Sequence, residues 1–144
     1  MSNNYATALE AAGATVLAFQ SFGSYQGDWW AKVRFEDKTV WVHGYYGSCS
    51  GCDSFNAEFT WEGDKCDEHA YNDAAAAMCL DCQAAAQKYA DNLARFGARY
   101  LEPSEVLDQA AAEKKVSENL DWDLDAVDML KWIQQNKINT IEGA

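Results

Sequence analysis

The stretch WWAKVRFEDKTVWVHGYY, residues 29–46, decides the fold. Charged residues at 36–38 divide it into two halves, and apolar side chains recur at every second position in each half. These apolar residues are Ala31, Val33, Phe35, Val40 and Val42. A period of two is typical of strands that bury one face. The stretch therefore predicts a half-buried antiparallel β-hairpin that turns at the charged segment.

The residues on both sides of the hairpin extend this prediction. ATVLAFQSFGSY, residues 14–25, is rich in Val, Leu and Phe and predicts a strand that runs into a Gly-Ser turn. FNAEFTW, residues 55–61, predicts a further strand. Residues 3–12 predict a short helix that ends at Gly13. The first half of the chain is thus expected to form a small, aromatic, antiparallel sheet.

The second half of the chain changes to a helical period. From residue 73 to 96, one stripe at intervals of three and four consists of Cys82, Ala86, Tyr89, Leu93 and Phe96. This stripe predicts a long amphipathic helix that Gly97 closes. Ser104 is a natural N-cap for a second helix. A last helix fits residues 123–136, with Val127, Leu130 and Ile133 on one face.

We therefore predict an α+β fold in which the C-terminal helices pack on the small N-terminal sheet. The 144 residues have the size of one domain, 1–144, which is sheet-rich over 14–61 and helix-rich over 73–140. Hydrophobic residues make up 49% and aromatic residues 13% of the chain, which is unlike the composition of disordered proteins. No run reaches the length of a membrane span, and the first residues lack a secretory pattern. We expect a soluble cytoplasmic protein.

The charge is strongly negative, with 23 acidic and 11 basic residues and a net charge of −12. Such a surface repels phosphate backbones, so direct binding of nucleic acid through a basic patch is not expected. The acids provide solubility, or they form a field for a basic partner protein. The candidate partner contacts are Asp64, Asp67, Glu68, Asp121, Asp123, Asp125 and Asp128. For the last four, capping of a helix N-terminus is the alternative role.

The cysteines and one histidine form three pairs with the same spacing, namely Cys49 with Cys52, Cys66 with His69, and Cys79 with Cys82. Two intervening residues allow a tight turn to direct both ligands at one ion, and zinc takes four such donors in a tetrahedron. A reducing cytoplasm and an odd number of cysteines disfavour a full set of disulfides. The spacing therefore predicts a structural zinc site.

Six candidate ligands exceed the need of one ion. The preferred set is Cys49, Cys52, Cys79 and Cys82, which would connect the sheet loop to the start of the long helix. Cys66 and His69 are reserve ligands. Two alternatives remain: the thiols are buried core residues, or CSGC is a redox motif. His43 is expected to be a hydrogen-bonded surface residue and not a ligand.

Common catalytic motifs are absent from the sequence. It contains no HExxH, no GxSxG, no phosphate-binding GxxxxGK[ST], and no deaminase arrangement of His-x-Glu with Pro-Cys-x-x-Cys. A catalytic Cys/His pair stays open as a minor alternative. Several rings crowd around the predicted sheet and its glycine loops, where they could stack on a base. These rings are Trp29, Trp30, Trp41, Tyr45, Tyr46 and Trp61. Most are expected in the core, and a ligand pocket is the competing interpretation.

Three stretches carry a resemblance to known proteins. Residues 23–59, with the core YGSCSGCD, together with CDEHAY and CLDCQAAAQKYADNLARFGARYL, resemble small acidic proteins encoded by bacteriophages. In size, charge and origin the chain is similar to anti-CRISPR proteins that inhibit effectors of the Cas9 type. The resemblance implies a location in the host bacterial cytoplasm and a CRISPR effector as partner. It transfers no residue-level motif.

Two functions therefore compete. The preferred one is a non-enzymatic, zinc-stabilised inhibitor whose acidic surface occupies the positively charged channel of a Cas9-type effector and blocks DNA loading. The other is a phage binding module that sequesters a nucleotide-like small molecule in the aromatic sheet. A zinc-supported structural or regulatory protein with neither activity is a third possibility.

Overall fold

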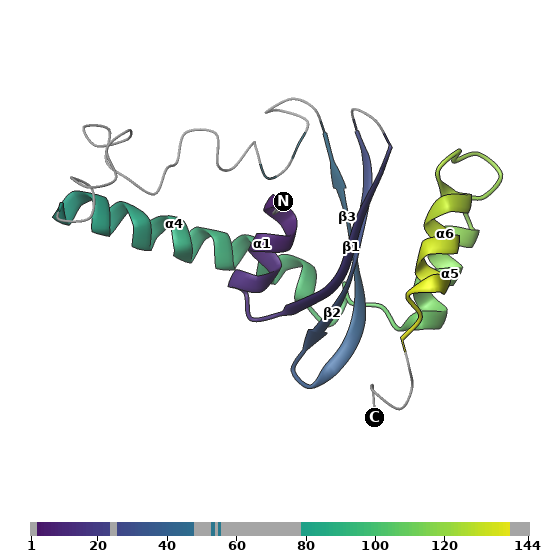
Figure 1. The fold of residues 1–144 in the computed structure, drawn as a ribbon, viewed down its shortest axis with the longest axis horizontal. Coiled ribbons are helices and arrows are strands. Elements are labelled where there is room, and N and C mark those ends of the chain that lie inside the picture. Colours follow the sequence, from purple (N-terminus) through teal and green to yellow (C-terminus); the bar gives the residue numbers. More distant parts are fainter. Residues whose placement is uncertain (1–2, 24–25, 48–52, 54, 56–78, 139–144) are drawn as a thin grey trace.

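The computed structural model describes residues 3–23, 26–47, 53, 55 and 79–138, and these residues form an α+β fold, as predicted (Figure 1). The elements in chain order are helix α1 (Asn4–Ala11), strands β1 (Thr15–Gly23), β2 (Gly27–Phe35) and β3 (Lys38–Tyr46), helix α4 (Leu80–Ala98), the 3-10 turn η2 (Arg99–Leu101), and helices α5 (Gln109–Ser117) and α6 (Ala126–Gln135). The predicted strand at residues 55–61 lies outside the described residues, apart from Phe55.

The three strands form an antiparallel sheet with the order β1-β2-β3, so β2 is central. The predicted hairpin is confirmed, with Phe35 paired to Lys38 across a two-residue turn. Both turn residues have positive φ angles, 52° for Glu36 and 65° for Asp37. Two positive φ values in a two-residue loop define the turn type whose twist matches that of the strands, and this type favours Asn-Gly.

We expect the double change Glu36→Asn with Asp37→Gly to raise the free energy of unfolding by about 1 kcal/mol, because left-handed backbone is costly for glutamate and free of strain for glycine. Urea denaturation of the purified protein measures the change. Asp37→Ala is the control, and it should lower stability because alanine tolerates positive φ less well than aspartate. A double variant no more stable than the parent would contradict the assigned strain.

Helices cover both faces of the sheet, which gives three layers (Figure 1). Helices α1 and α4 lie on one face and α5 and α6 on the other. The core on the first face joins side chains of the sheet, such as Trp29, Val33 and Val42, to Leu9 of α1 and Phe96 of α4. The sequence pattern predicts that the hairpin buries one face only. This part of the prediction is incomplete, because helices cover both faces of the sheet.

The core on the second face is built around two tryptophans of the hairpin. Trp30 and Trp41 are 1% and 0% exposed and pack against Val116 of α5 and Ile133 of α6. The Trp41 indole N–H donates to Gln109 Oε1 over 2.7 Å, which fixes the start of α5 against the sheet. This packing explains why Trp41, which lies between the aliphatic residues Val40 and Val42 of β3, is not on the surface.

The chain passes from one face to the other across the outer edge of β3. In the connection between η2 and α5, Leu107 pairs with Trp41 through two backbone hydrogen bonds of 2.7 and 2.9 Å. The segment 102–106 forms a turn in which Glu105 N donates to Glu102 O over 2.8 Å. The prediction that Ser104 begins a helix is therefore wrong. Asp108 is the N-cap instead, because its carboxylate accepts from Ala111 N over 2.7 Å.

Two further helix predictions need correction. Gly97 does not close α4, which continues to Ala98; it lies buried against α1, where its missing side chain leaves room for the Ala8 carbonyl. The buried face of α6 carries Ala126, Met129 and Ile133, whereas Val127 is exposed. Neighbouring residues lie about 100° apart around a helix. The face of α6 that packs against the sheet is therefore rotated by about one position from the predicted face. The helix ending at Gly13 is confirmed, and Gly13 has a φ of 104°.

A hydrogen-bonded cluster joins α5 to α6. Glu113 Oε1 accepts from Gln134 over 3.0 Å and its Oε2 accepts from Gln109 over 3.1 Å. These two amide donors favour the charged carboxylate and lower the pKa of Glu113. Gln109 Oε1 also accepts from Ile138 N over 2.9 Å. Gln109 therefore connects the sheet, α5 and the segment that follows α6.

Buried Asp53 connects α1 to the end of the sheet. Its Oδ1 accepts from the Tyr5 hydroxyl over 2.7 Å and from Gly47 N over 2.9 Å. Tyr5 in turn stacks on Trp29, with ring centroids 5.2 Å apart. Asp53, the last residue of the YGSCSGCD core at residues 46–53, therefore has a structural role in the first core.

Candidate functional site

The structure places half of the preferred zinc ligands. Cys79 is the residue that immediately precedes α4, and Cys82 is buried in the first turn of that helix. Cys49 and Cys52, and the reserve ligands Cys66 and His69, lie outside the described residues. Within the described part of the chain, no group of three or more potential ligands is close enough to hold a metal. The zinc site therefore stays a prediction.

The predicted partner contacts divide in the same way. Asp64, Asp67 and Glu68 lie outside the described residues, whereas the second group lies at the junction of α5 and α6. Asp121, Asp123 and Asp125 belong to the α5–α6 loop, residues 118–125, and Asp128 lies in the first turn of α6. The α5–α6 loop and the start of α6, which carry these four residues, lie at one end of the α5–α6 layer (Figure 1).

Backbone hydrogen bonds hold the α5–α6 loop in a defined shape. Asn119 O accepts from Trp122 N over 3.3 Å and from Asp123 N over 2.9 Å. Asp123 O accepts from Ala126 N over 3.2 Å, and the Asp123 carboxylate accepts from Asp125 N over 2.9 Å. Asp123 therefore has a structural role in the loop, but α6 has no side-chain N-cap hydrogen bond, so the capping alternative is not confirmed. The loop presents its other side chains from a stable backbone.

Large apolar side chains on this loop point into solvent. Trp122 is 72% exposed and Leu124 is 95% exposed, and Leu120 and Val127 add to the same region. Sequence reasoning missed these residues because it considered only the acids there. The signal was present in LDWDLD, residues 120–125, where apolar residues alternate with aspartates. Together with the four aspartates, Leu120, Trp122, Leu124 and Val127 form what we call the acidic-apolar surface.

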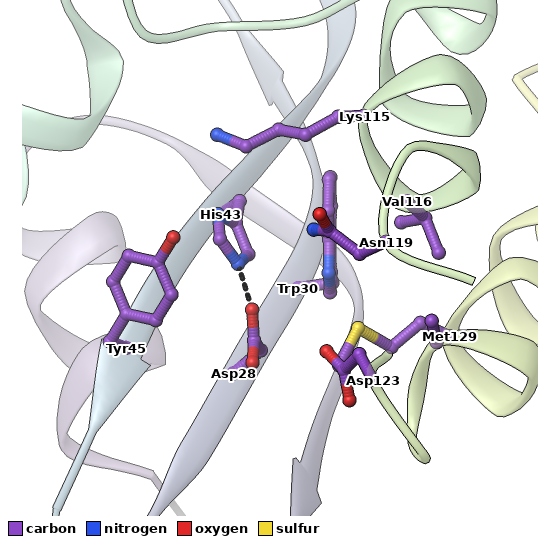
Figure 2. Close-up of a pocket in the computed structure, with 10 residues that line it drawn as sticks. Asp28, Trp30, His43, Tyr45, Lys115, Val116, Asn119, Asp123 and Met129 are labelled. Carbon is purple, nitrogen blue, oxygen red and sulfur yellow. Dashed lines mark hydrogen bonds and ion pairs between the residues drawn. The ribbon is translucent and has the colours of Figure 1, made fainter. Parts of the chain in front are cut away.

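A histidine–aspartate pair lies on the same side of the sheet. His43 Nε2 is 2.6 Å from Asp28 Oδ2, on neighbouring strands β3 and β2 (Figure 2). The His43 ring lies between Trp30 and Tyr45, with centroid distances of 4.5 and 4.8 Å. Only 5% of the His43 side chain is exposed. His43 is therefore hydrogen-bonded, as predicted, but it is enclosed and not at the surface.

A small cavity of about 20 Å³ separates this pair from the α5–α6 layer. Its walls include Asp28, His43, Asn119 and Asp123, so the base of the α5–α6 loop faces the histidine–aspartate pair (Figure 2). Trp30 also lines this cavity, and its buried indole N–H has no hydrogen-bond partner among the described residues. Among the described residues that line this cavity there is no serine or cysteine.

A larger cavity of about 440 Å³ lies beside the edge of β3. It is lined by His43, Gly44, Tyr45, Arg99, Tyr100, Glu105 and Lys115. The volume is within the range of about 300–1,000 Å³ that is typical of small-molecule sites. Three residues, His43, Tyr45 and Lys115, border both cavities. The two spaces therefore adjoin around His43.

The aromatic residues proposed for ligand binding have different positions. Trp29, Trp30 and Trp41 are buried in the two cores, whereas Tyr45 is 65% exposed. The Tyr46 hydroxyl donates to Phe22 O over 2.9 Å, and burial, followed by Asp125 and Asp28, raises the pKa of Tyr46. Trp61 lies outside the described residues. Of this group, Tyr45 is the ring that reaches the larger cavity, and Tyr100 joins it from η2.

Comparisons with known proteins do not assign a family. No protein-family model matches the chain, and neither the curated proteins nor the solved structures provide a match. Among the described helices, none combines the length and apolar character needed to cross a membrane.

Proposed function

We propose that this chain is a non-enzymatic binding protein whose acidic-apolar surface occupies a positively charged surface of another protein. The observation that carries the proposal is the exposure of Trp122 and Leu124 on a hydrogen-bonded loop among four aspartates. Exposed apolar residues rimmed by charges are typical of protein interaction sites. Large aromatic side chains are also enriched among the residues that dominate binding energy.

The two kinds of side chain on this surface have different roles. Trp122 and Leu124 gain free energy when a partner removes them from water, because burial of a large apolar side chain is worth about 1.5–3 kcal/mol. The aspartates attract a basic partner, increase the association rate and disfavour acidic competitors. The net charge of −12 acts in the same direction over a longer range.

The partner that we propose is a CRISPR effector of the Cas9 type. Such effectors hold a guide–target heteroduplex in a positively charged channel, which an acidic protein can occupy in place of DNA. The support is the charge complementarity together with the resemblance to small acidic phage proteins. The proposal includes a structural zinc ion bound by Cys49, Cys52, Cys79 and Cys82, and additional contacts from Asp64, Asp67 and Glu68.

We expect the double variant Trp122→Ala with Leu124→Ala to bind the partner at least about 30-fold more weakly, which corresponds to the loss of one dominant contact of about 2 kcal/mol. Binding to guide-loaded Cas9-type effectors is measured by surface plasmon resonance at two salt concentrations. Leu17→Ala is a matched control, because Leu17 is also exposed but lies on β1. It should bind as the parent does.

A second variant tests the charges separately from the apolar contacts. Asp121→Asn with Asp125→Asn should reduce the association rate and weaken its dependence on salt, since fewer charges steer the encounter. Failure of the parent protein to bind any guide-loaded effector would exclude the named partner. Equal losses in the loop variant and the Leu17→Ala control would show that the acidic-apolar surface is not the contact.

A further inference from the structure

Among the described residues, the larger cavity lies beside β3, the outer strand of the sheet, on the edge where Leu107 pairs with Trp41. Peptide groups in an antiparallel strand alternate in direction. The peptide groups of His43 and Tyr45 therefore point to the same edge as those of Trp41. The backbone groups of these two lining residues therefore point to the outer edge of β3.

Two basic residues line the cavity, although the protein as a whole has a net charge of −12. These are Arg99, from η2, and Lys115, from α5, and the Arg99 guanidinium also lies 5.2 Å from the centroid of the Phe96 ring. Figure 2 shows the Lys115 side chain extending past His43 toward the side on which Tyr45 lies. Among the described residues that line the cavity, Glu105 is the acidic one. Two cations on different elements around one space are suited to a phosphate, which arginine and lysine bind with charge-assisted hydrogen bonds.

The aromatic walls are held in place before any ligand binds. Tyr100 packs edge-on against Trp29 and Phe96, with centroid distances of 5.0 and 5.7 Å. Tyr45 contacts the His43 ring edge-on, and Asp28 fixes that ring through the 2.6 Å hydrogen bond. Rings held in this way lose little entropy when a ligand binds. They offer faces on which a base can stack, a contact worth about 1–3 kcal/mol.

Gly44, which lines the cavity, has the Trp29 ring packed directly against its backbone. A Cβ atom at this residue would lie 2.5 Å from the Trp29 ring, so the absence of a side chain allows Trp29 to lie directly over β3. Trp29 in turn supports Tyr100. The glycine thus connects the packing of the first core with the shape of the cavity.

From these observations we propose that the cavity at the edge of β3 binds a free nucleotide. The base stacks on Tyr45 or Tyr100, and the phosphate lies between Arg99 and Lys115. Glu105 accepts a hydrogen bond from a sugar hydroxyl or a base amino group. This site is separate from the acidic-apolar surface and does not depend on the partner proposed above.

Isothermal titration calorimetry with AMP, GMP, CMP and UMP tests the proposal, with adenosine and inorganic phosphate as separate probes. We expect saturable binding of at least one nucleotide that is tighter than binding of either probe. Lys115→Gln should weaken it by about tenfold or more, since a hydrogen bond to a charged group is lost. Lys114→Gln is the matched control, because Lys114 is the neighbouring exposed lysine of α5 and does not line the cavity.

Tyr45→Ala gives a second test at an exposed position where folding is not at risk. It should weaken nucleotide binding, whereas Tyr45→Phe retains the stacking face and should bind with nearly the parent affinity. The Trp122→Ala, Leu124→Ala variant should bind nucleotide normally, which separates this site from the proposed function. The proposal is overturned if no nucleotide saturates at millimolar concentration, if phosphate alone binds as tightly, or if Lys114→Gln weakens binding as much as Lys115→Gln.

Discussion

Replacing Trp41 with alanine should lower the free energy of unfolding by about 3–5 kcal/mol, the range for removing a fully buried tryptophan. The indole is 0% exposed and contacts the rings of Trp30 and Trp132 at centroid distances of 6.4 and 5.5 Å. Its loss also removes the 2.7 Å hydrogen bond to Gln109, which connects the sheet to α5. Because natural domains are stable by about 5–15 kcal/mol, much of the total stability is at risk. Urea denaturation followed by tryptophan fluorescence and circular dichroism measures the change.

Two variants show which part of the Trp41 side chain matters. Trp122→Ala removes the same side chain from an exposed position, and it should change stability by no more than about 0.5 kcal/mol. Trp41→Phe retains most of the buried ring but loses the indole N–H, so its stability should fall between those of the parent and Trp41→Ala. If Trp41→Ala and Trp122→Ala cost the same, the second core does not have the packing described here.

The second large effect is expected at Gly97, where alanine should destabilise the protein by more than about 3 kcal/mol, the upper end of the usual range for overpacking. A Cβ atom there would overlap the carbonyl group of Ala8 and approach Leu9 N to 3.0 Å. These are backbone atoms, which cannot rotate away as a side chain does. Accommodation therefore requires α1 and α4 to separate, and this opens the first core around Leu9 and Phe96.

Helix propensity alone predicts the opposite sign for this substitution, because alanine inside a helix is favoured over glycine by about 0.8–1 kcal/mol. Ala98→Gly is the control for propensity: it lies one position further along α4 and is exposed, and it should cost no more than about 1 kcal/mol. A stabilised Gly97→Ala variant would mean that α1 does not cross α4 at this glycine. Urea denaturation of both variants decides between the two signs.

The elements that depend on neighbouring residues were predictable from the sequence. The hairpin around residues 36–38 follows from the period of two, and the end of α1 at Gly13 follows from the freedom of glycine at positive φ. For α4, the predicted stripe is confirmed at Cys82, Leu93 and Phe96, which are buried, but it is wrong at Ala86, which is exposed, and Tyr89 is half-buried. In each case the information lies within a few residues of the element concerned.

The candidate sites were less predictable, since they depend on which surfaces remain uncovered. The acids at Asp121, Asp123, Asp125 and Asp128 were identified from charge, but the exposure of Trp122 and Leu124 was not. Composition alone favours burial of such residues. The cavity residues Arg99, Glu105 and Lys115 come from different elements, so no local spacing connects them.

The sequence by itself determined the α+β class, the hairpin and the helical character of the second half, because these follow from periodicity and from the backbone preferences of single residues. Only the tertiary structure decided that helices cover both faces of the sheet, that Gly97 is a contact between helices, and that a cavity remains beside β3. The physical reason is that these features depend on distances between segments far apart in the chain. Such distances are set when both faces of the sheet are packed.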